Sequence, residues 1–406
     1  MRPGPLVAAL CTAEILTMLG ASSFAALLPP FTALWSLSAA EAGWISGIFY
    51  VGYTLAVPVL VTSTDSKDPR SIYLACAALT AASAFLFAWF ADGFWSAMAF
   101  RLLAGVGLAG TYMPGLRILT DQISGPSQSR AVAFYTSSFG LGTALSFLFT
   151  ERSTALLSWQ WSFAIAGVAA AVACAIALLK VPARRLAAAA ARRNLRADLA
   201  LVLRDRTALR FSIAYAVHNW ELFGYRSWLV AYLAFAAAAT GRDASLPPTA
   251  VAAVATLLGM AASIVGNEIA ARTNRPRTVV AFMLLSAVTC LGFGMASGLP
   301  PALLAAIALL HATLIAADSA AMTAGLVACA PAERRGMTMA MYSCVGFLGA
   351  FLGPTVFGTA LGLAGPAVAG GWIAAFASIS IVLVVGAAAF VALGLRSETA
   401  RRSDGA

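Results

Sequence analysis

Long apolar segments constrain this chain more than any other feature of its sequence. Twelve runs of roughly 20 or more mostly apolar residues follow one another, separated by short segments rich in charge, proline or glycine. A helix needs roughly 20 such residues to cross a bilayer. The runs cover residues 6–28, 43–62, 71–90, 94–119, 131–150, 159–181, 209–238, 248–271, 278–296, 301–330, 337–363 and 368–395. We therefore expect an all-α integral membrane protein with twelve transmembrane helices.

The scarcity of charge excludes the soluble alternatives. Charged residues make up 10% of the chain and hydrophobic residues 61%, whereas a soluble globular domain carries about 25% charged residues. Disorder requires the opposite balance, low hydrophobicity with high net charge. The first run contains Glu14 and is too long for a signal-peptide core, so we interpret it as a retained helix that enters a turn at Pro29 and Pro30.

The basic residues give the orientation. Of the 26 basic residues, 22 fall in segments on one side of the membrane if both termini are cytoplasmic, and only Arg152 and Arg242 fall in outer loops. Basic residues collect in cytoplasmic loops, so we expect a bacterial inner-membrane protein with both termini in the cytoplasm. Anionic lipid headgroups then account for the net charge of +10 without a nucleic-acid partner.

Enzyme signatures are missing from the sequence. All six cysteines lie within the apolar runs, so we expect no disulfide, and no CxxC, HExxH or Walker-type motif occurs. We therefore predict neither an enzyme nor a cofactor or metal site.

The two halves of the chain resemble each other. With a shift of 207 residues, segment 65–70 overlays segment 272–277 with its Pro-Arg pair in register, and Glu14 overlays Glu221. Such repeats are common in secondary transporters.

We therefore divide the chain into three parts: a six-helix bundle over residues 1–181, a basic linker over 182–208, and a second, pseudo-symmetric six-helix bundle over 209–406. The linker fits either a solvated connector or an amphipathic helix on the inner leaflet.

Several motifs resemble those of the major facilitator superfamily. The run Arg101-x-x-x-Gly105-x-Gly107-x-Ala109 is similar to the family's R-x-x-x-G-x-G-x-A motif, and the turn after the second run is similar in part to its inner-loop motif. The resemblance implies two bundles, with the first, fourth, seventh and tenth helices lining a central cavity. It also implies gating roles for Asp65, Lys67, Arg70, Gly105, Gly107, Gly346, Gly349, Gly353 and Pro354.

Ionisable residues inside the membrane are the sharpest functional signal. A charge at mid-bilayer costs about 2.5–3.5 kcal/mol on insertion scales, so ionisable residues there indicate functional positions. They all lie on the four helices expected to line the cavity: Glu14, Arg101, His218, Glu221, Arg226, His311 and Asp318.

Four of these residues are candidates for proton coupling. Glu14 either alternates between a protonated and an Arg101-paired state or forms a permanent ion pair with Arg101. Glu221 is a second candidate. His311 and Asp318 are seven residues apart and share a helix face, so they fit a proton relay, or Asp318 forms a hydrogen bond across helices.

The remaining candidates would bind the solute. Arg101 and Arg226 suit an anion because a guanidinium binds a carboxylate in bidentate fashion, although Arg226 also fits a structural bridge. His218 and five tyrosines would line the cavity, and each tyrosine by itself also fits plain packing: Tyr50, Tyr53, Tyr112, Tyr225 and Tyr342.

These features predict a monomeric secondary transporter that works by alternating access. We expect proton-coupled symport of a small polar solute, an organic acid or another anion, with lipid and protons as its other partners. One alternative is a proton-antiport exporter of drugs or metabolites. Another is a membrane receptor or sensor that transports nothing.

Overall fold

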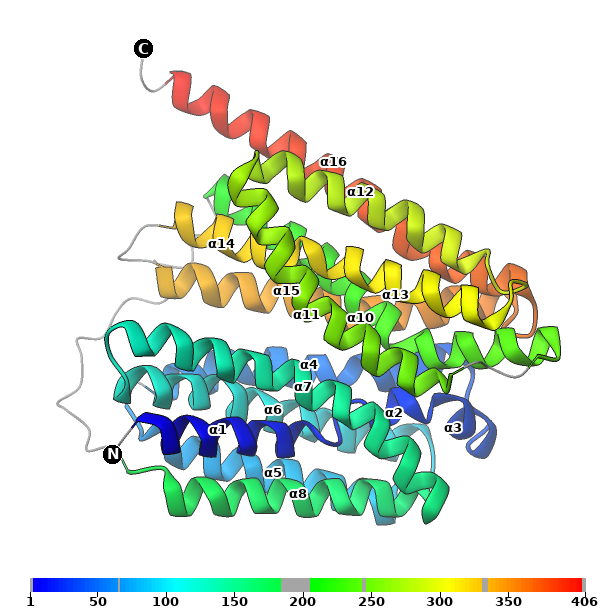
Figure 1. Ribbon diagram of the computed structural model, residues 1–406, viewed down its shortest axis with the longest axis horizontal. Helices are drawn as coiled ribbons and strands as arrows, with labels where there is room; N and C mark the ends of the chain where they lie inside the picture. Colours follow the sequence, from blue (N-terminus) through cyan, green and yellow to red (C-terminus); the bar gives the residue numbers. More distant parts are fainter. Residues whose placement is uncertain (1–2, 65, 184–204, 243–245, 331–334, 404–406) are drawn as a thin grey trace. The chain divides into compact units, whose positions relative to one another are not determined.

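The computed structural model describes residues 3–64, 66–183, 205–242, 246–330 and 335–403. Within these residues every regular element is a helix, as the apolar runs predicted (Figure 1). Eleven helices are long and apolar enough to cross a membrane, and a shorter apolar helix at residues 4–18 belongs to the first run. The all-α membrane fold is thereby confirmed.

The chain divides into two compact units, one comprising residues 1–191 and 247–257 and the other residues 192–246 and 258–406. The linker, predicted to be either a solvated connector or an amphipathic helix, lies largely at 184–204, outside the described residues. Within the described residues, the first unit holds the start of α11 and eight whole helices: α1 (Pro3–Met18), α2 (Ser23–Ala26), α3 (Leu28–Leu34), α4 (Ala39–Ser63), α5 (Pro69–Phe90), α6 (Phe94–Gln122), α7 (Pro126–Leu156) and α8 (Trp159–Lys180).

The second unit holds the remaining helices: α10 (Arg206–Thr240), most of α11 (Pro248–Arg272), α12 (Arg275–Gly294), α13 (Pro301–Ala317), α14 (Ser319–Cys329), α15 (Arg335–Ala364) and α16 (Ala369–Ser403). Side chains cap several of these helices where they begin. Asp205 accepts hydrogen bonds from the Thr207 and Ala208 amides at the start of α10, and Asn274 accepts one from the Arg277 amide at the start of α12.

The first membrane segment differs from the prediction. The sequence suggested one helix over 6–28 and a turn at Pro29 and Pro30, but α1 ends at Met18, and the prolines lie in the first turn of α3. Proline fits there because the first helical amides have no intrahelical partner to lose. The turn falls instead at residues 19–22, between α1 and α2.

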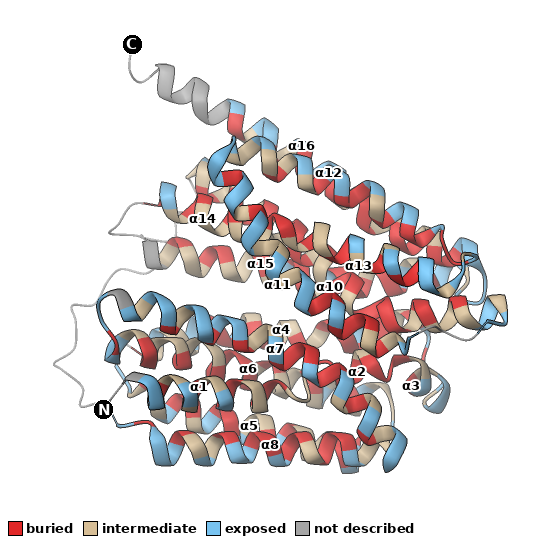
Figure 2. Cartoon of the chain, in the orientation of Figure 1, coloured by how far each residue is buried: buried red, intermediate tan, exposed pale blue. Residues whose placement is uncertain are grey.

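Apolar side chains cover the outer faces of the helices. Figure 2 shows exposed residues along the outward sides of the ribbons, and many of them are large and hydrophobic, such as Leu55, Ile264 and Val288, which are 67%, 72% and 70% exposed. A soluble protein seldom exposes so many. The surface is therefore suited to lipid.

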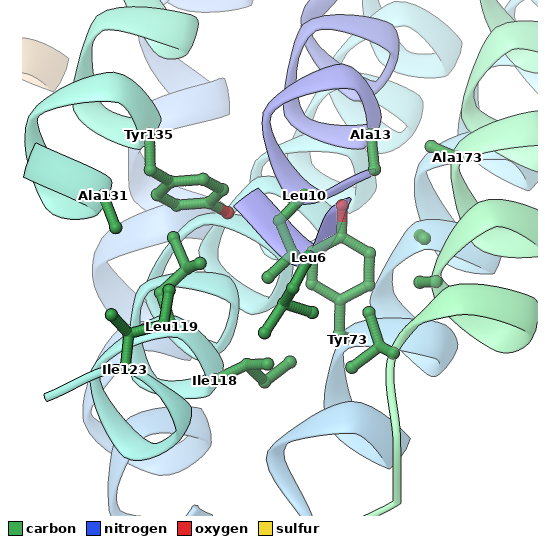
Figure 3. Close-up of a cluster of buried hydrophobic side chains, with 13 residues drawn as sticks. Leu6, Leu10, Ala13, Tyr73, Ile118, Leu119, Ile123, Ala131, Tyr135 and Ala173 are labelled. Carbon is green, nitrogen blue, oxygen red and sulfur yellow. The ribbon is translucent and has the colours of Figure 1, made fainter. Parts of the chain in front are cut away.

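Inside the first unit, α1 packs against α7 and α8. Figure 3 shows Leu6 and Leu10 of α1 between the aromatic rings of Tyr73 and Tyr135, all four fully or almost fully buried. The core is therefore apolar, but it carries two phenol groups at its centre.

The predicted gating glycines lie where helices approach closely. A Cβ atom on Gly105 would collide with the Phe49 carbonyl, and one on Gly107 with the Thr80 hydroxyl. In the second unit, Gly349 and Gly353 of α15 face the Ala216 and Trp220 carbonyls of α10 in the same way, and Gly346 faces the Tyr215 ring. These glycines set the spacing between helices, and their gating role stays a prediction.

The turn between α4 and α5 was predicted to act through Asp65, Lys67 and Arg70. Asp65 lies outside the described residues, and Lys67 is exposed. Arg70 donates a hydrogen bond of 2.5 Å to the Leu178 carbonyl near the end of α8, where a cation is favoured by the helix dipole. Asp68 caps α5 by accepting from the Arg70 amide at 3.0 Å.

Candidate functional site

The break between α1 and α2 is held by polar groups. Ser22 donates its amide to Ser146 Oγ at 3.0 Å, and the Ser23 and Thr150 hydroxyls lie 2.8 Å apart. Arg101 donates to the Ala21 carbonyl at 3.2 Å. Backbone groups released by a broken helix need such partners in a membrane, and discontinuous helices in transporters often border the binding region.

Arg101 also lies beside a small cavity in the first unit. The cavity measures about 40 Å³, which is room for about three water molecules at 10–15 Å³ each. The Arg101 guanidinium carbon is 4.5 Å from the ring centroid of Phe49 and 5.8 Å from that of Phe24. Besides Arg101, the wall includes four phenylalanines and three hydroxyl groups: Phe49, Phe87, Phe100, Phe163, Thr17, Thr80 and Ser83.

Glu14 lies elsewhere in the same unit. Its side chain is fully buried, and Oε2 is 3.1 Å from the Tyr135 hydroxyl. Glu14 and Arg101, both within the described residues, do not form an ion pair. The structure therefore does not bring these two predicted partners together, and Glu14 is held by a phenol instead.

In the second unit, two histidine–carboxylate pairs join the same pair of membrane segments. His218 Nδ1 of α10 is 2.8 Å from Asp318 Oδ1 at the α13–α14 junction. Glu221 Oε1 of α10 is 3.7 Å from His311 Nε2 of α13. The pairs are reciprocal, because α10 supplies the base of one pair and the acid of the other. All four side chains are nearly or fully buried.

His311 and Asp318 were predicted to fit one of two arrangements. They would form a proton relay because they share a face of the tenth segment, or Asp318 would form a hydrogen bond across helices. In the structure each of them faces α10, so Asp318 has a partner on another helix. Helix α13 ends at Ala317, so the segment is interrupted at Asp318. Beside the interruption, the Ala317 carbonyl lies so close to Gly266 that a Cβ atom on residue 266 would collide with it.

Helix α12 completes the Glu221–His311 pair. Ser286 donates a hydrogen bond of 2.6 Å to Glu221 Oε1, and Thr289 Oγ1 lies 3.1 Å from His311 Nδ1. The ring of Tyr225 meets His311 edge to face at 5.0 Å. The acid and the base therefore each have a hydroxyl neighbour from the same helix.

The tyrosines predicted to face the solute have other partners. Tyr225 donates to the Ala308 carbonyl at 2.8 Å, and Tyr342 stacks on Tyr215 with 4.1 Å between ring centroids. Tyr53 is almost fully buried, while Tyr50 and Tyr112 are partly exposed.

The two arginines also differ in surroundings. The Arg226 guanidinium carbon lies 5.4 Å from the ring centroid of Phe223, and its side chain is only partly buried. Arg101 is 6% exposed. Arg101 lines the cavity described above.

Sequence reasoning missed the hydroxyl partners on α12. Ser286 and Thr289 are three residues apart and thus share a helix face, a signal that the sequence did contain. Ser286 and Thr289 are neither ionisable nor on the four helices expected to line the cavity, so they were not among the predicted site residues. The role of Tyr135 as the partner of Glu14 was not anticipated either.

Apolar helices in two units, with ionisable side chains buried inside each, define a multi-pass membrane protein of the transporter class. The chain belongs to the Major Facilitator Superfamily, whose family model matches residues 10–251 and 238–406. Its similarity to transporters extends to solved structures. The chain is therefore a transporter and not an enzyme.

Two solved structures illustrate the shared fold. A bacterial homologue of the human lysosomal transporter Spinster superimposes with a TM-score of 0.79 at 16% identity, covering 96% of each chain. The nucleoside transporter NupG superimposes with a TM-score of 0.78 at 15% identity, covering 97% of this chain and 99% of that one. At such low identity, these likenesses show the fold alone.

One curated relative is similar in sequence over a shorter stretch. The niacin transporter NiaP of Acinetobacter baylyi is 27% identical over 140 residues, which is 34% of this chain. The chain spans less than a third of that relative's length, since the match covers 31% of it.

Proposed function

We propose that this transporter couples the movement of a small organic acid to protons, as a monomer in the bacterial inner membrane with both termini in the cytoplasm. One observation carries the proposal. Glu14 and Glu221 are fully buried carboxyls, and within the described residues neither forms an ion pair with Lys or Arg. Their polar partners are hydroxyl groups and a histidine.

A buried carboxylate without a cation is costly in a low-dielectric interior. A proton removes that charge, and its release restores it. A carboxyl in such a place can therefore bind a proton in one state of the transport cycle and release it in another. This is the behaviour that a proton-coupled transporter requires.

The proposal that the solute is an organic acid is based on Arg101 and its cavity. A buried guanidinium offers donors for a carboxylate, a group that the cavity has room for in this conformation. The phenylalanine rings offer apolar faces for a small ring, which would enter when the cavity widens during the transport cycle. The similarity to a niacin transporter supports the same class, because niacin is a small aromatic carboxylic acid. We therefore propose an aromatic or short-chain carboxylate as the solute.

A two-stage experiment tests the function. Purified protein is first screened for a rise in melting temperature with nicotinate, benzoate, nicotinamide and adenosine, since a ligand that binds only the folded state stabilises it. Nicotinate and benzoate should raise the melting temperature, and the uncharged nicotinamide should not. Stabilisation by nicotinamide or adenosine alone would exclude an anionic solute.

The stabilising compound is then tested in proteoliposomes with an imposed pH gradient. Symport predicts accumulation on the side towards which protons flow. Accumulation in the opposite direction would replace symport by the antiport alternative. Flux that ignores the gradient in both directions would exclude proton coupling altogether.

The anion assignment predicts a loss of affinity in Arg101→Lys. Lysine keeps the charge but loses the bidentate fork. Binding of a carboxylate should weaken about tenfold, the equivalent of roughly 1.4 kcal/mol, measured as the ligand concentration that stabilises the protein by half the maximum. The matched control is Arg117→Lys, which lies in an exposed pair with Asp121. Unchanged affinity in Arg101→Lys would contradict the assignment.

A further inference from the structure

The Thr289 hydroxyl identifies which nitrogen of His311 carries a proton. Thr289 Oγ1 lies 3.1 Å from the Leu285 carbonyl, 3.0 Å from the Ser286 carbonyl and 3.1 Å from His311 Nδ1. A hydroxyl has one proton to donate and two lone pairs to accept. Threonine in a helix commonly donates to a carbonyl of the preceding turn. When Thr289 donates to one of these carbonyls, its lone pair faces Nδ1, and we infer that Nδ1 is the donor of this contact.

This assignment leaves the other nitrogen without a proton in the neutral ring. His311 Nε2 is buried, has no hydrogen-bond partner, and lies 3.7 Å from Glu221 Oε1. Glu221 Oε1 already accepts from Ser286. Two acceptors therefore face each other, an arrangement that is unfavourable unless a proton or a metal ion lies between them.

We propose that Glu221 and His311 share one proton, with Thr289 and Ser286 as the residues that position the pair. The proton is bonded either to the Glu221 carboxyl or to His311 Nε2, and its transfer breaks one bond as it forms the other. The pair is neutral overall with the proton and carries a single negative charge without it. This inference rests on the proposed function, because it names where the second unit would hold the coupling proton.

A metal ion is the rival occupant of this place. The ligand atoms of Glu221, Cys290 and His311 lie within 4.8 Å of one another. A metal would require the Cys290 thiolate. The Cys290 Sγ instead lies 3.6 Å from the Phe376 carbonyl, to which a thiol donates. A protonated thiol favours a shared proton over a metal ion.

Other titratable groups surround the pair from each neighbouring helix. Helix α10 contributes Tyr225 and His218, α12 contributes Cys290, and the α13–α14 junction contributes Asp318. The hydroxyl of Tyr225 is engaged with the Ala308 carbonyl. His218 and Asp318 form the second pair, so this base and this acid face each other and not the Glu221–His311 pair.

The chain contains only two histidines, which makes a direct experiment possible. The full-length protein is labelled with ¹⁵N-histidine in lipid and examined by solid-state NMR, which separates protonated from bare ring nitrogens. His218→Asn assigns the two sets of signals. We expect His311 Nδ1 to be protonated throughout a pH titration and Nε2 to take part in proton exchange. A bare Nδ1 in the neutral ring of the wild type would overturn the proposal.

Variants of Thr289 test the positioning role. Thr289→Val removes the hydroxyl and should shift the His311 proton from Nδ1 to Nε2, while Thr289→Ser should restore the wild-type pattern. Unchanged signals in Thr289→Val would show that Thr289 does not fix the tautomer. If Thr289→Val fails to fold, Ser286→Ala provides the second measurement, in which Nδ1 should stay protonated while the Nε2 signal changes.

Zinc addition separates the proton from the metal. Zn²⁺ should leave both His311 signals unchanged, and a shift of Nε2 with Zn²⁺ that is lost in Cys290→Ser would overturn the shared proton. None of these measurements uses a solute or a gradient. Failure of the tautomer pattern with intact gradient-driven flux would therefore reject this inference alone, whereas the expected pattern without flux would reject the proposed function.

Discussion

The two units hold their buried carboxyls in different ways. In the first unit, Glu14 lies beside a phenol, Tyr135, and in the second unit Glu221 and Asp318 each face a histidine. Tyrosine is a poor proton acceptor near neutral pH, and histidine is a good one. The second unit can therefore pass a proton between an acid and a base inside the protein, whereas Glu14 can only hold its proton or give it up.

The single hydroxyl proton of Tyr135 links the protonation of Glu14 to a contact between helices. The Tyr135 hydroxyl lies 3.1 Å from Glu14 Oε2 and 3.1 Å from the Thr111 carbonyl, but it has one proton to donate. A protonated Glu14 that donates to Tyr135 lets the hydroxyl donate to Thr111. In the ionised state, Tyr135 must turn to Glu14 and leave that carbonyl. Loss of the proton from Glu14 thus changes a contact between α6 and α7.

The largest expected effect comes from removing a buried carboxyl. Glu14→Gln and Glu221→Gln should each abolish gradient-driven uptake while retaining exchange of labelled for unlabelled solute, because glutamine binds no coupling proton. Gradient-driven uptake and solute exchange are both measured with labelled solute in proteoliposomes. Glu268→Gln, in an exposed pair with Arg272, is the control and should transport normally. Normal uptake by Glu14→Gln would place coupling in the second unit alone.

The next effect concerns stability. His218→Leu leaves Asp318 buried without its base, and removal of one partner from a buried pair costs about 3–5 kcal/mol. Denaturant unfolding should show this loss, and the double variant with Asp318→Leu should recover most of it. An exposed control, Arg272→Ala, should cost about 1 kcal/mol or less. A small loss in His218→Leu would mean that Asp318 does not depend on the histidine.

A smaller effect is expected in the first unit. Tyr135→Phe removes a hydroxyl from Glu14 without removing a base, and an unsatisfied buried group costs about 1–3 kcal/mol. The same unfolding measurement should place this variant between His218→Leu and Arg272→Ala. A loss as large as that of His218→Leu would contradict the difference drawn between the units.

The membrane fold could be predicted from the sequence because its signals are local. Apolar run length needs no knowledge of packing, and eleven spans agree with the predicted runs. The sequence did not predict the interruption at Asp318 in one of these spans or the break after Met18. The break after Met18 depends on Ser146, Thr150 and Arg101 from distant segments. No local pattern marks a turn that distant side chains stabilise.

The sequence lists the buried ionisable residues but does not say which of them lie beside one another. Helical spacing left open whether His311 and Asp318 act together or Asp318 bonds across helices. Which residues meet depends on the register between two helices, and that register is set by close packing along their whole length. The contribution of Ser286 and Thr289 depends on the same register.

Movement of protons with the solute through the buried carboxyls is tested most directly by the pH change that solute addition evokes in weakly buffered proteoliposomes. Wild type and Glu221→Gln are compared under the same conditions. We expect the carboxylate identified by the stabilisation screen to make the outer medium more alkaline with wild type and to leave it unchanged with Glu221→Gln. Solute entry without any pH change in the wild type would contradict this expectation.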